Sequence, residues 1–190
     1  MRKLLGVLVL SVVTALALPS LAMATHSNGQ GPDKDFVNGA AKGPVPTPCG
    51  TPIAHFHTNG QSDVPVTGFP ATGNFWTDID FTTLPAGNCL GFVSAEFSGS
   101  VTCVNAQGNS AVWSGLIEEV ILQPGDVPGI PGLLFAGMGI LSRHVDNGSP
   151  GRNNDGAVGF PQPSPSTTCP HIAFTTSPII QGNLLVHDGV

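Results

Sequence analysis

Apolar and polar residues alternate one by one from Asn74 to Phe81. One set of alternate positions holds Phe75, Thr77, Ile79 and Phe81, and the other set holds Asn74, Trp76, Asp78 and Asp80. Successive side chains of a strand point to opposite faces of a sheet. A period of two with one apolar side therefore predicts an antiparallel strand that packs one face on a core.

Strand-like runs continue along the chain between clusters of Gly, Pro and Asn. From Ile53 onward, the further predicted strands are residues 90–97, 100–105, 111–121, 133–145, 157–160, 171–175 and 179–187. The sequence AQGN at 106–109 predicts a hairpin turn, because Gly and Asn tolerate the positive φ of tight loops. Three prolines predict a loop at 124–132, since proline donates no hydrogen bond to a strand ladder.

Eight or nine short strands at this spacing predict an all-β fold, either an antiparallel β-sandwich or a small barrel. Composition agrees with this fold class. Only 9% of the 190 residues are charged, whereas Gly (25) and Pro (18) are abundant. Helical surfaces need many more charged residues than that, so a turn-rich, weakly charged chain is typical of β structure.

Residues 1–24 have the pattern of a secretory signal peptide. Arg2 and Lys3 precede an apolar run from Leu4 to about Ala17, and Ala22–Ala24 forms an A-x-A cleavage site. No later apolar run approaches the ~18 residues of a membrane span. We therefore expect a secreted protein, extracellular or periplasmic, without a membrane span.

The rest of the chain divides by composition into an extended Gly/Pro-rich leader at 25–52 and a single β domain at 53–190. The formal charge of −6 becomes −8 when Arg2 and Lys3 are removed with the signal peptide. This balance argues against nucleic acid and anionic lipid as partners, because both select basic surfaces.

The chain has four cysteines, Cys49, Cys89, Cys103 and Cys169. An even number of cysteines in an exported chain predicts two disulfides, in one of three connectivities. There is no C-x-x-C pair, so a zinc ribbon or a thioredoxin-like redox site is not expected.

Three short motifs and a late cysteine follow one another in the second half of the chain. They are VTC…GN-x-A at 101–111, DNG-x-PG at 146–151, Cys169, and GN-x-x-VH at 182–187. In this order they resemble an uncharacterised group of exported bacterial β-domains, over about Asn74 to Asp188. The resemblance implies export, a β fold and a Cys103–Cys169 disulfide, which leaves Cys49 to pair with Cys89. It implies no activity, and the proline-rich segment 124–132 and the sequence GRNND at 151–155 depart from the group.

The segment DNGSPGRNND at 146–155 holds two candidate calcium ligands, Asp146 and Asp155. The third and fifth positions from Asp146, Gly148 and Pro150, carry no side-chain oxygen, unlike those of an EF-hand loop. We interpret the segment as a turn between two strands, because Asp and Asn side chains bond their own backbone there. A looser Ca²⁺ site that also uses Asn153 is the alternative.

His55 and His57 would share one face of a strand, within joint reach of a transition metal. A third ligand would have to come from His144, His171, His187 or an acid, and no spacing requires this. We interpret the pair as solvent-facing histidines and expect no cofactor.

Trp76, Asp78 and Asp80 share the polar face of the strand at 74–81, about 6–7 Å apart for alternate residues. Two carboxylates at this spacing are compatible with a glycosidase, and the tryptophan with a stacked sugar. The simpler interpretation is the wet side of an amphipathic strand. The three residues remain the candidate ligand-binding site.

No G-x-S-x-G, Walker or dinucleotide-binding motif is present, so the sequence supports no common hydrolase or nucleotide enzyme. We expect an exported, non-catalytic β module with a structural, adhesive or ligand-binding role. The alternatives are a carbohydrate-binding surface and a metal-dependent enzyme built around His55 and His57. A glycan or another cell-surface component is the candidate partner.

Overall fold

The computed structural model describes residues 34–47, 50–64, 68–84, 91–125, 134–148, 155–172 and 174–189. These residues form nine strands and one turn of 3-10 helix, so the predicted all-β fold is confirmed. The elements are β1 (Phe36–Pro44), β2 (Ile53–Ser62), β3 (Ala71–Asp80), η1 (Phe81–Thr83), β4 (Phe92–Gln107), β5 (Ser110–Pro124), β6 (Gly139–Val145), β7 (Gly156–Gln162), β8 (Ser177–Pro178) and β9 (Gln181–His187). None of the described residues forms a helix long and apolar enough to cross a membrane.

The nine strands make one antiparallel sheet in the order β8-β7-β6-β5-β4-β3-β2-β1-β9. The two edge strands, β8 and β9, are consecutive in the chain and are separated only by Ile179 and Ile180. The N–H of Ile180 donates to the carbonyl of Lys42 in β1, and that of Ile179 to the carbonyl of Asp155 before β7. The sheet therefore curls until its two edges meet, as a half-barrel.

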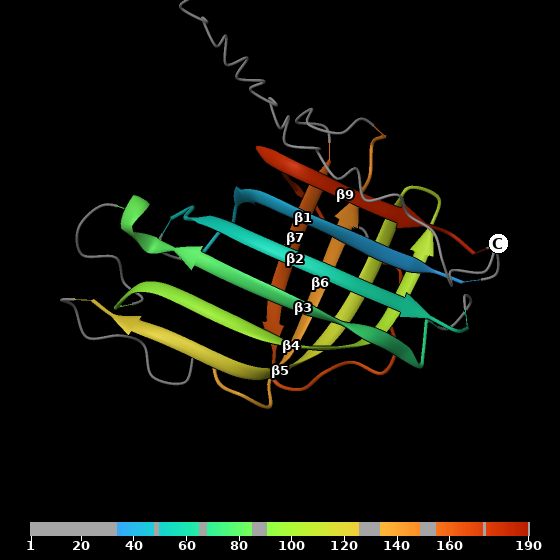
Figure 1. The fold of residues 1–190 in the computed structure, drawn as a ribbon, viewed down its shortest axis with the longest axis horizontal. Coiled ribbons are helices and arrows are strands. Elements are labelled where there is room, and N and C mark those ends of the chain that lie inside the picture. Colours follow the sequence, from blue (N-terminus) through green and yellow to red (C-terminus); the bar gives the residue numbers. More distant parts are fainter. Residues whose placement is uncertain are drawn as a thin grey trace, which may run out of the picture.

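Bending of the two longest strands divides this sheet into two layers, which cross one another in Figure 1. The first part of β4 pairs with β3 over Ser94–Ser100, whereas the first part of β5 pairs with β6 over Ser110–Leu116. We call β9, β1, β2 and β3, with the adjoining halves of β4 and β5, the front layer. The other halves of β4 and β5, with β6, β7 and β8, form the back layer.

The bend in β4 lies at Gly99. The register of β4 against β5 shifts between Ser98 and Gly99, and again between Val101 and Cys103. A Cβ on Gly99 would lie 1.8 Å from the carbonyl oxygen of Leu116. Only glycine allows this approach, and shifts of register increase the local bend of a strand. Consequently the two strands predicted at 90–97 and 100–105 are one continuous, bent strand.

The main hydrophobic core lies between the layers. Phe75 of β3 is 2% exposed and packs against Trp113 of β5, with ring centroids 5.3 Å apart. The buried members of this core are Val37, Ala54, Phe75, Ile79, Phe81, Ala95, Phe97, Val101, Val104, Ala106, Ala111, Trp113, Ile117, Met138 and Ile140. Trp76, by contrast, is exposed on the opposite face of β3. The faces assigned to this strand from its alternation are thus confirmed.

The sheet begins before Ile53, unlike the leader expected at 25–52. Phe36–Pro44 forms β1, an internal strand between β2 and β9. Its inward positions include Val37, Ala41 and Gly43, which are buried but mostly small. Small residues give almost no apolar alternation, so the period of two was not visible in this part of the sequence.

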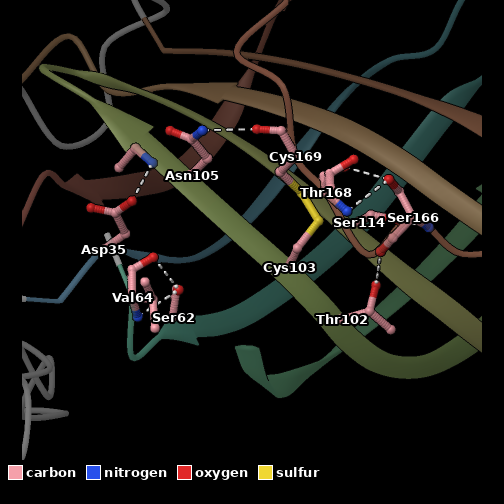
Figure 2. Close-up of a disulfide and its surroundings, with 11 residues drawn as sticks. Asp35, Ser62, Val64, Thr102, Cys103, Asn105, Ser114, Ser166, Thr168 and Cys169 are labelled. Atoms are coloured by element: carbon pink, nitrogen blue, oxygen red, sulfur yellow. Dashed lines mark hydrogen bonds between the residues drawn. A yellow bond between two sulfur atoms is a disulfide. The ribbon is translucent and has the colours of Figure 1, made fainter. Parts of the chain in front are cut away.

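Asp35 connects the start of β1 to two other parts of the chain. Its carboxylate accepts hydrogen bonds from the N–H of Ala106 at 3.0 Å and from that of Gly189 at 3.1 Å (the first is drawn in Figure 2). Burial raises the pKa of Asp35, and these two hydrogen bonds oppose that effect. The carboxylate therefore joins β1, the β4–β5 hairpin and the C-terminal segment.

Two further predicted strands have different bounds, and a third does not form. The strand predicted at 133–145 is restricted to Gly139–Val145, and the one at 157–160 extends over Gly156–Gln162. The described residues of 171–175 form no strand, so that prediction is wrong. The hairpin predicted around 106–109 is confirmed, because Gln107 pairs with Ser110 at the tip of β4 and β5.

The connection between β7 and β8, residues 163–176, covers the outer face of the back layer in its described part. Cys103 of β4 and Cys169 of the connection form a disulfide (Figure 2), as the resemblance implies. Thr102 donates to the carbonyl of Ser166, and the amide of Asn105 donates to that of Cys169, both at 2.8 Å. A second small core lies here, formed by Cys103, Val112, Leu141, Cys169 and the partly buried Phe174. Cys49 and Cys89 lie outside the described residues.

Candidate functional site

A cavity of about 250 Å³ lies between the front and back layers. Both layers contribute to its wall, which is largely apolar. The lining residues are Gly43, Pro44, Val45, Pro46, Thr47, Ala54, Phe56, Thr77, Ile79, Phe81, Phe97, Trp113, Ile117, Leu134, Ile140, Ser142, His144, Ala157, Val158, Gly159, Phe160, Pro161, Ser177 and Ile179. We call it the interlayer cavity.

The cavity wall reaches the surface at one end. Pro46 and Pro161 line it and are exposed. By contrast, Ala54 and Ile117 are completely buried elsewhere in the same wall. A small molecule could therefore enter between the end of β1 and the end of β7.

His144 is the one ionisable side chain among the described residues of the wall. It lies on β6, is 1% exposed, and packs between Phe56 and Trp113, with ring centroids 5.5 and 5.6 Å away. The indole N–H of Trp113 donates to His144 Nε2 at 3.2 Å. Burial lowers the pKa of His144 to about 3, so the imidazole is neutral near pH 7.

The second nitrogen of His144, Nδ1, has no hydrogen-bond partner among the described residues. Because Nε2 accepts a hydrogen bond, a neutral imidazole carries its proton on Nδ1. Nδ1 is buried, and it makes no hydrogen bond in the described structure. A buried donor without an acceptor costs about 1–3 kcal/mol, so a ligand that supplied an acceptor would recover part of that energy.

Ser142 is the other buried polar side chain of β6 in the wall, two residues before His144. Its hydroxyl donates to the carbonyl of Val158 at 2.7 Å. The proton of the hydroxyl is therefore engaged by the backbone. The lone pair on His144 Nε2 is engaged by Trp113, so the two side chains do not form a nucleophile and base pair.

Four of the candidates from the sequence, His55, His57, Trp76 and Asp78, lie on the outer face of the front layer. His55, Asp78 and Glu96 are aligned across β2, β3 and β4. His57 and Trp76 form the adjacent row. The indole N–H of Trp76 donates to Glu96 Oε1 at 2.7 Å, and the ring is 36% exposed. We call these five residues the polar outer face.

His55 and His57 have no third metal ligand beside them among the described residues. That part of the chain contains no group of three or more His, Cys, Asp or Glu side chains that could hold an ion. Both side chains are exposed, whereas His144 is enclosed between the layers. His187 stacks on Phe36 at a centroid distance of 4.9 Å. The three-histidine arrangement considered from the sequence is therefore not assembled.

Asp80 has a structural role at the end of β3. Its carboxylate accepts hydrogen bonds from both the backbone N–H and the hydroxyl of Thr82, and so caps η1. These hydrogen bonds hold the pKa of Asp80 below its ordinary value. The register places Asp80 opposite Ile53, two residue pairs beyond the row of Asp78. Asp80 thus belongs to the cap rather than to the polar outer face.

The segment 146–155 joins β6 to β7. The pairing of these two strands begins next to this segment, with Val145 opposite Gly156. Asp146 Oδ1 accepts from the N–H of Gly148 at 2.8 Å, as in an Asx turn. This Asx turn agrees with the interpretation of the segment as a turn between strands, for which residues 149–154 lie outside the described residues. Asn153, the third candidate calcium ligand, lies outside the described residues.

Asp146 and Asp155 use their remaining oxygens to bind the edge of β9. Asp155 Oδ2 accepts from the N–H of Leu184 at 3.0 Å, and Asp146 Oδ2 accepts from that of Val186 at 3.3 Å. Successive residues of a strand point their N–H groups to opposite edges, so Leu184 and Val186, two residues apart, both present theirs on the edge away from β1. Two carboxylates therefore replace a neighbouring strand, and both serve the fold as acceptors of backbone hydrogen bonds.

Sequence reasoning considered His144 only as a third metal ligand and did not identify the cavity. A weak signal was present, since Ser142 and His144 are in phase with Ile140 along β6. A polar pair on an inward face indicates a buried polar site. Which residues oppose that face depends on the bend of the sheet.

Comparisons with protein-family models, curated proteins and solved structures give no match to this chain. The geometry of the interlayer cavity and of the polar outer face is therefore the basis for a functional assignment.

Proposed function

We propose that this protein is an exported, non-catalytic β module that binds a small apolar molecule in the interlayer cavity. The observation that carries the proposal is the cavity itself, about 250 Å³ within a largely apolar wall. Well-formed apolar pockets with a few polar groups are the usual sites for small molecules in proteins. A cavity of 150 Å³ holds benzene, so by proportion this one accommodates about ten non-hydrogen atoms.

The energetic cost of such a space also favours an occupant. Residual cavities destabilise proteins by about 24 cal/mol per Å³, which gives at most about 6 kcal/mol for an enclosed void of this size. The net stability of a domain is only about 5–15 kcal/mol. The interlayer cavity reaches the surface, so its cost is below this bound, and a ligand that fills it and leaves the fold unchanged would offset part of that cost.

A non-catalytic role is supported by the state of the two buried polar side chains of β6 in the wall. The hydroxyl proton of Ser142 is donated to Val158, and the basic nitrogen of His144 accepts from Trp113. Neither group has a free function for nucleophilic or general-base chemistry. Export is supported by the signal-peptide pattern of residues 1–24 and by the Cys103–Cys169 disulfide, since disulfides persist in oxidising compartments.

Calorimetric titration with α-methylstyrene, a neutral hydrocarbon of suitable size, tests this function. Gly159 lines the cavity, and a Cβ there would make only ordinary contacts, the nearest at 3.5 Å to Ser142 Oγ. Gly159→Leu should fill the cavity and abolish binding. Gly125→Leu is the matched control, because a Cβ on Gly125 also has its nearest contact at 3.5 Å but lies outside the cavity. Absence of binding to the wild type, or equal binding to both variants, would refute the proposal.

A second candidate function is carbohydrate binding by the polar outer face. The hydrogen bond to Glu96 holds the exposed ring of Trp76 in place, and His57 lies beside it in the register. An oriented, exposed aromatic ring among polar side chains suits stacking on a sugar. On a glycan array, Trp76→Ala should lose signals that the wild type gives, and Phe135→Ala, which removes another exposed ring, should keep them. Equal signals for all three proteins would eliminate this candidate.

A further inference from the structure

The interlayer cavity contains one polar group whose hydrogen-bonding capacity is unused. His144 Nδ1 is buried and has no partner among the described residues, although the side chain lines the cavity. The two neighbouring rings, Phe56 and Trp113, offer no acceptor oxygen or nitrogen to it. Buried polar groups are satisfied in the great majority of native structures. An unsatisfied donor on a side chain that lines an apolar cavity points to a ligand that brings the acceptor.

We propose that the cavity selects an uncharged, mainly hydrocarbon molecule with a single carbonyl group, such as a ketone, aldehyde or ester, whose carbonyl oxygen accepts a hydrogen bond from His144 Nδ1–H. This inference rests on the proposed function and specifies its ligand class. The apolar wall supplies affinity by removing hydrocarbon surface from water. The imidazole provides selectivity between molecules of the same shape, because only a molecule with a hydrogen-bond acceptor satisfies the Nδ1–H donor.

The Trp113 hydrogen bond also determines the charge that the site accepts. A cationic imidazole would need a second proton on Nε2, which would then face the indole N–H of Trp113, donor against donor. His144 therefore cannot become cationic to balance a bound anion without losing this bond. A carboxylate would remain an unpaired charge in an apolar cavity, and such burial is strongly unfavourable. The site should consequently prefer a neutral carbonyl to a carboxylate.

The experiment uses three probes of the same planar shape and the same number of non-hydrogen atoms. They are α-methylstyrene, without an acceptor, acetophenone, with a neutral acceptor, and benzoate, with an anionic one. Each is titrated calorimetrically into the full mature protein near pH 7. We expect acetophenone to bind at least tenfold more tightly than benzoate. Benzoate as the tightest ligand would overturn the proposal.

His144→Leu separates the hydrogen bond from the general hydrophobicity of the probes. The ratio of the Kd of α-methylstyrene to that of acetophenone should fall about tenfold in this variant, as expected for one buried hydrogen bond. Taking the ratio cancels differences in how the two probes partition out of water. An unchanged ratio in a folded variant would overturn the role assigned to His144.

Nuclear magnetic resonance of the wild type gives a result even if His144→Leu does not fold. The imidazole should carry its proton on Nδ1 in the free protein. Acetophenone should shift the Nδ1–H proton downfield, whereas α-methylstyrene should not. If both probes bind and neither produces that shift, the ligand class is wrong while the proposed function stands. If none of the probes binds, the proposed function itself fails.

Discussion

The back layer carries the connection between β7 and β8 across its outer face, whereas the front layer leaves its outer face to solvent. The residues that point outward differ accordingly. Cys103, Val112 and Leu141 are apolar and buried beneath the connection, while His55 and Trp76 are exposed. Both layers come from one alternating sheet. Apolar residues at the outward positions of a strand therefore indicate that another segment covers that face, and polar residues indicate that the face is exposed to solvent.

Removal of the disulfide is the largest change that this comparison predicts. Cys103 and Cys169 are 66 residues apart, and the chain-entropy model gives about 4 kcal/mol for closing such a loop. The double variant Cys103→Ala with Cys169→Ala should lose about this much unfolding free energy in urea. A loss below about 1 kcal/mol would show that the connection holds to the back layer without its covalent link.

The same contrast between buried and exposed positions applies to carboxylates. Asp155 is 1% exposed and accepts backbone hydrogen bonds from Asn147 and Leu184. Asp155→Ala leaves two donors without partners and should cost about 3 kcal/mol of unfolding free energy. Asp78→Ala on the polar outer face, the matched control, should change stability by about 0.5 kcal/mol or less. Similar losses for the two variants in denaturant titrations would contradict this assignment.

The third effect concerns pH and the interior histidine. Burial lowers the pKa of His144 to about 3 from an ordinary 6.5, so below pH 6.5 the unfolded chain binds a proton that the native protein does not. The stability contributed by neutral His144 is complete above pH 6.5 and is lost as the pH falls toward 3.

The expected loss is up to about 1.4 kcal/mol per pH unit, or roughly 2 kcal/mol between pH 6.5 and 5. The measurement is the unfolding free energy as a function of pH for the wild type and for His144→Leu. The difference between the two proteins isolates the histidine from the carboxylates. A difference that does not vary from pH 7 to 5 would be inconsistent with a buried, neutral imidazole.

The smallest effect belongs to the polar outer face. Trp76→Ala removes an exposed ring and its hydrogen bond to Glu96. Cross-strand pairs on an exposed face contribute about 0.2–1 kcal/mol, so the unfolding free energy measured in urea should fall by no more than that. A loss above about 2 kcal/mol would indicate that the ring stabilises the front layer, and would weaken the comparison between the two faces.

The local features of the fold could be predicted from the sequence. The alternation at 74–81 identified which side of β3 is buried, and Gly108 with Asn109 identified the β4–β5 turn. β1 was not recognised, because Ala and Gly at its inward positions leave no contrast between its faces. The polar outer face could be predicted only in part. Alternation along one strand places Trp76 and Asp78 on the same face, but the position of Glu96 beside them depends on how β3 pairs with β4.

Local patterns in the sequence are sufficient to predict the class of structure, namely short alternating strands with turn residues between them, because side-chain period and backbone preferences are local. The bend of the sheet at Gly99, and the bonding of its β9 edge by the carboxylates of Asp146 and Asp155, follow only from the three-dimensional fold. The same folding placed His144 beside an apolar space. A period of two specifies which face of a strand is buried, but the bend and the register determine which residues lie opposite that face and how much space remains between them.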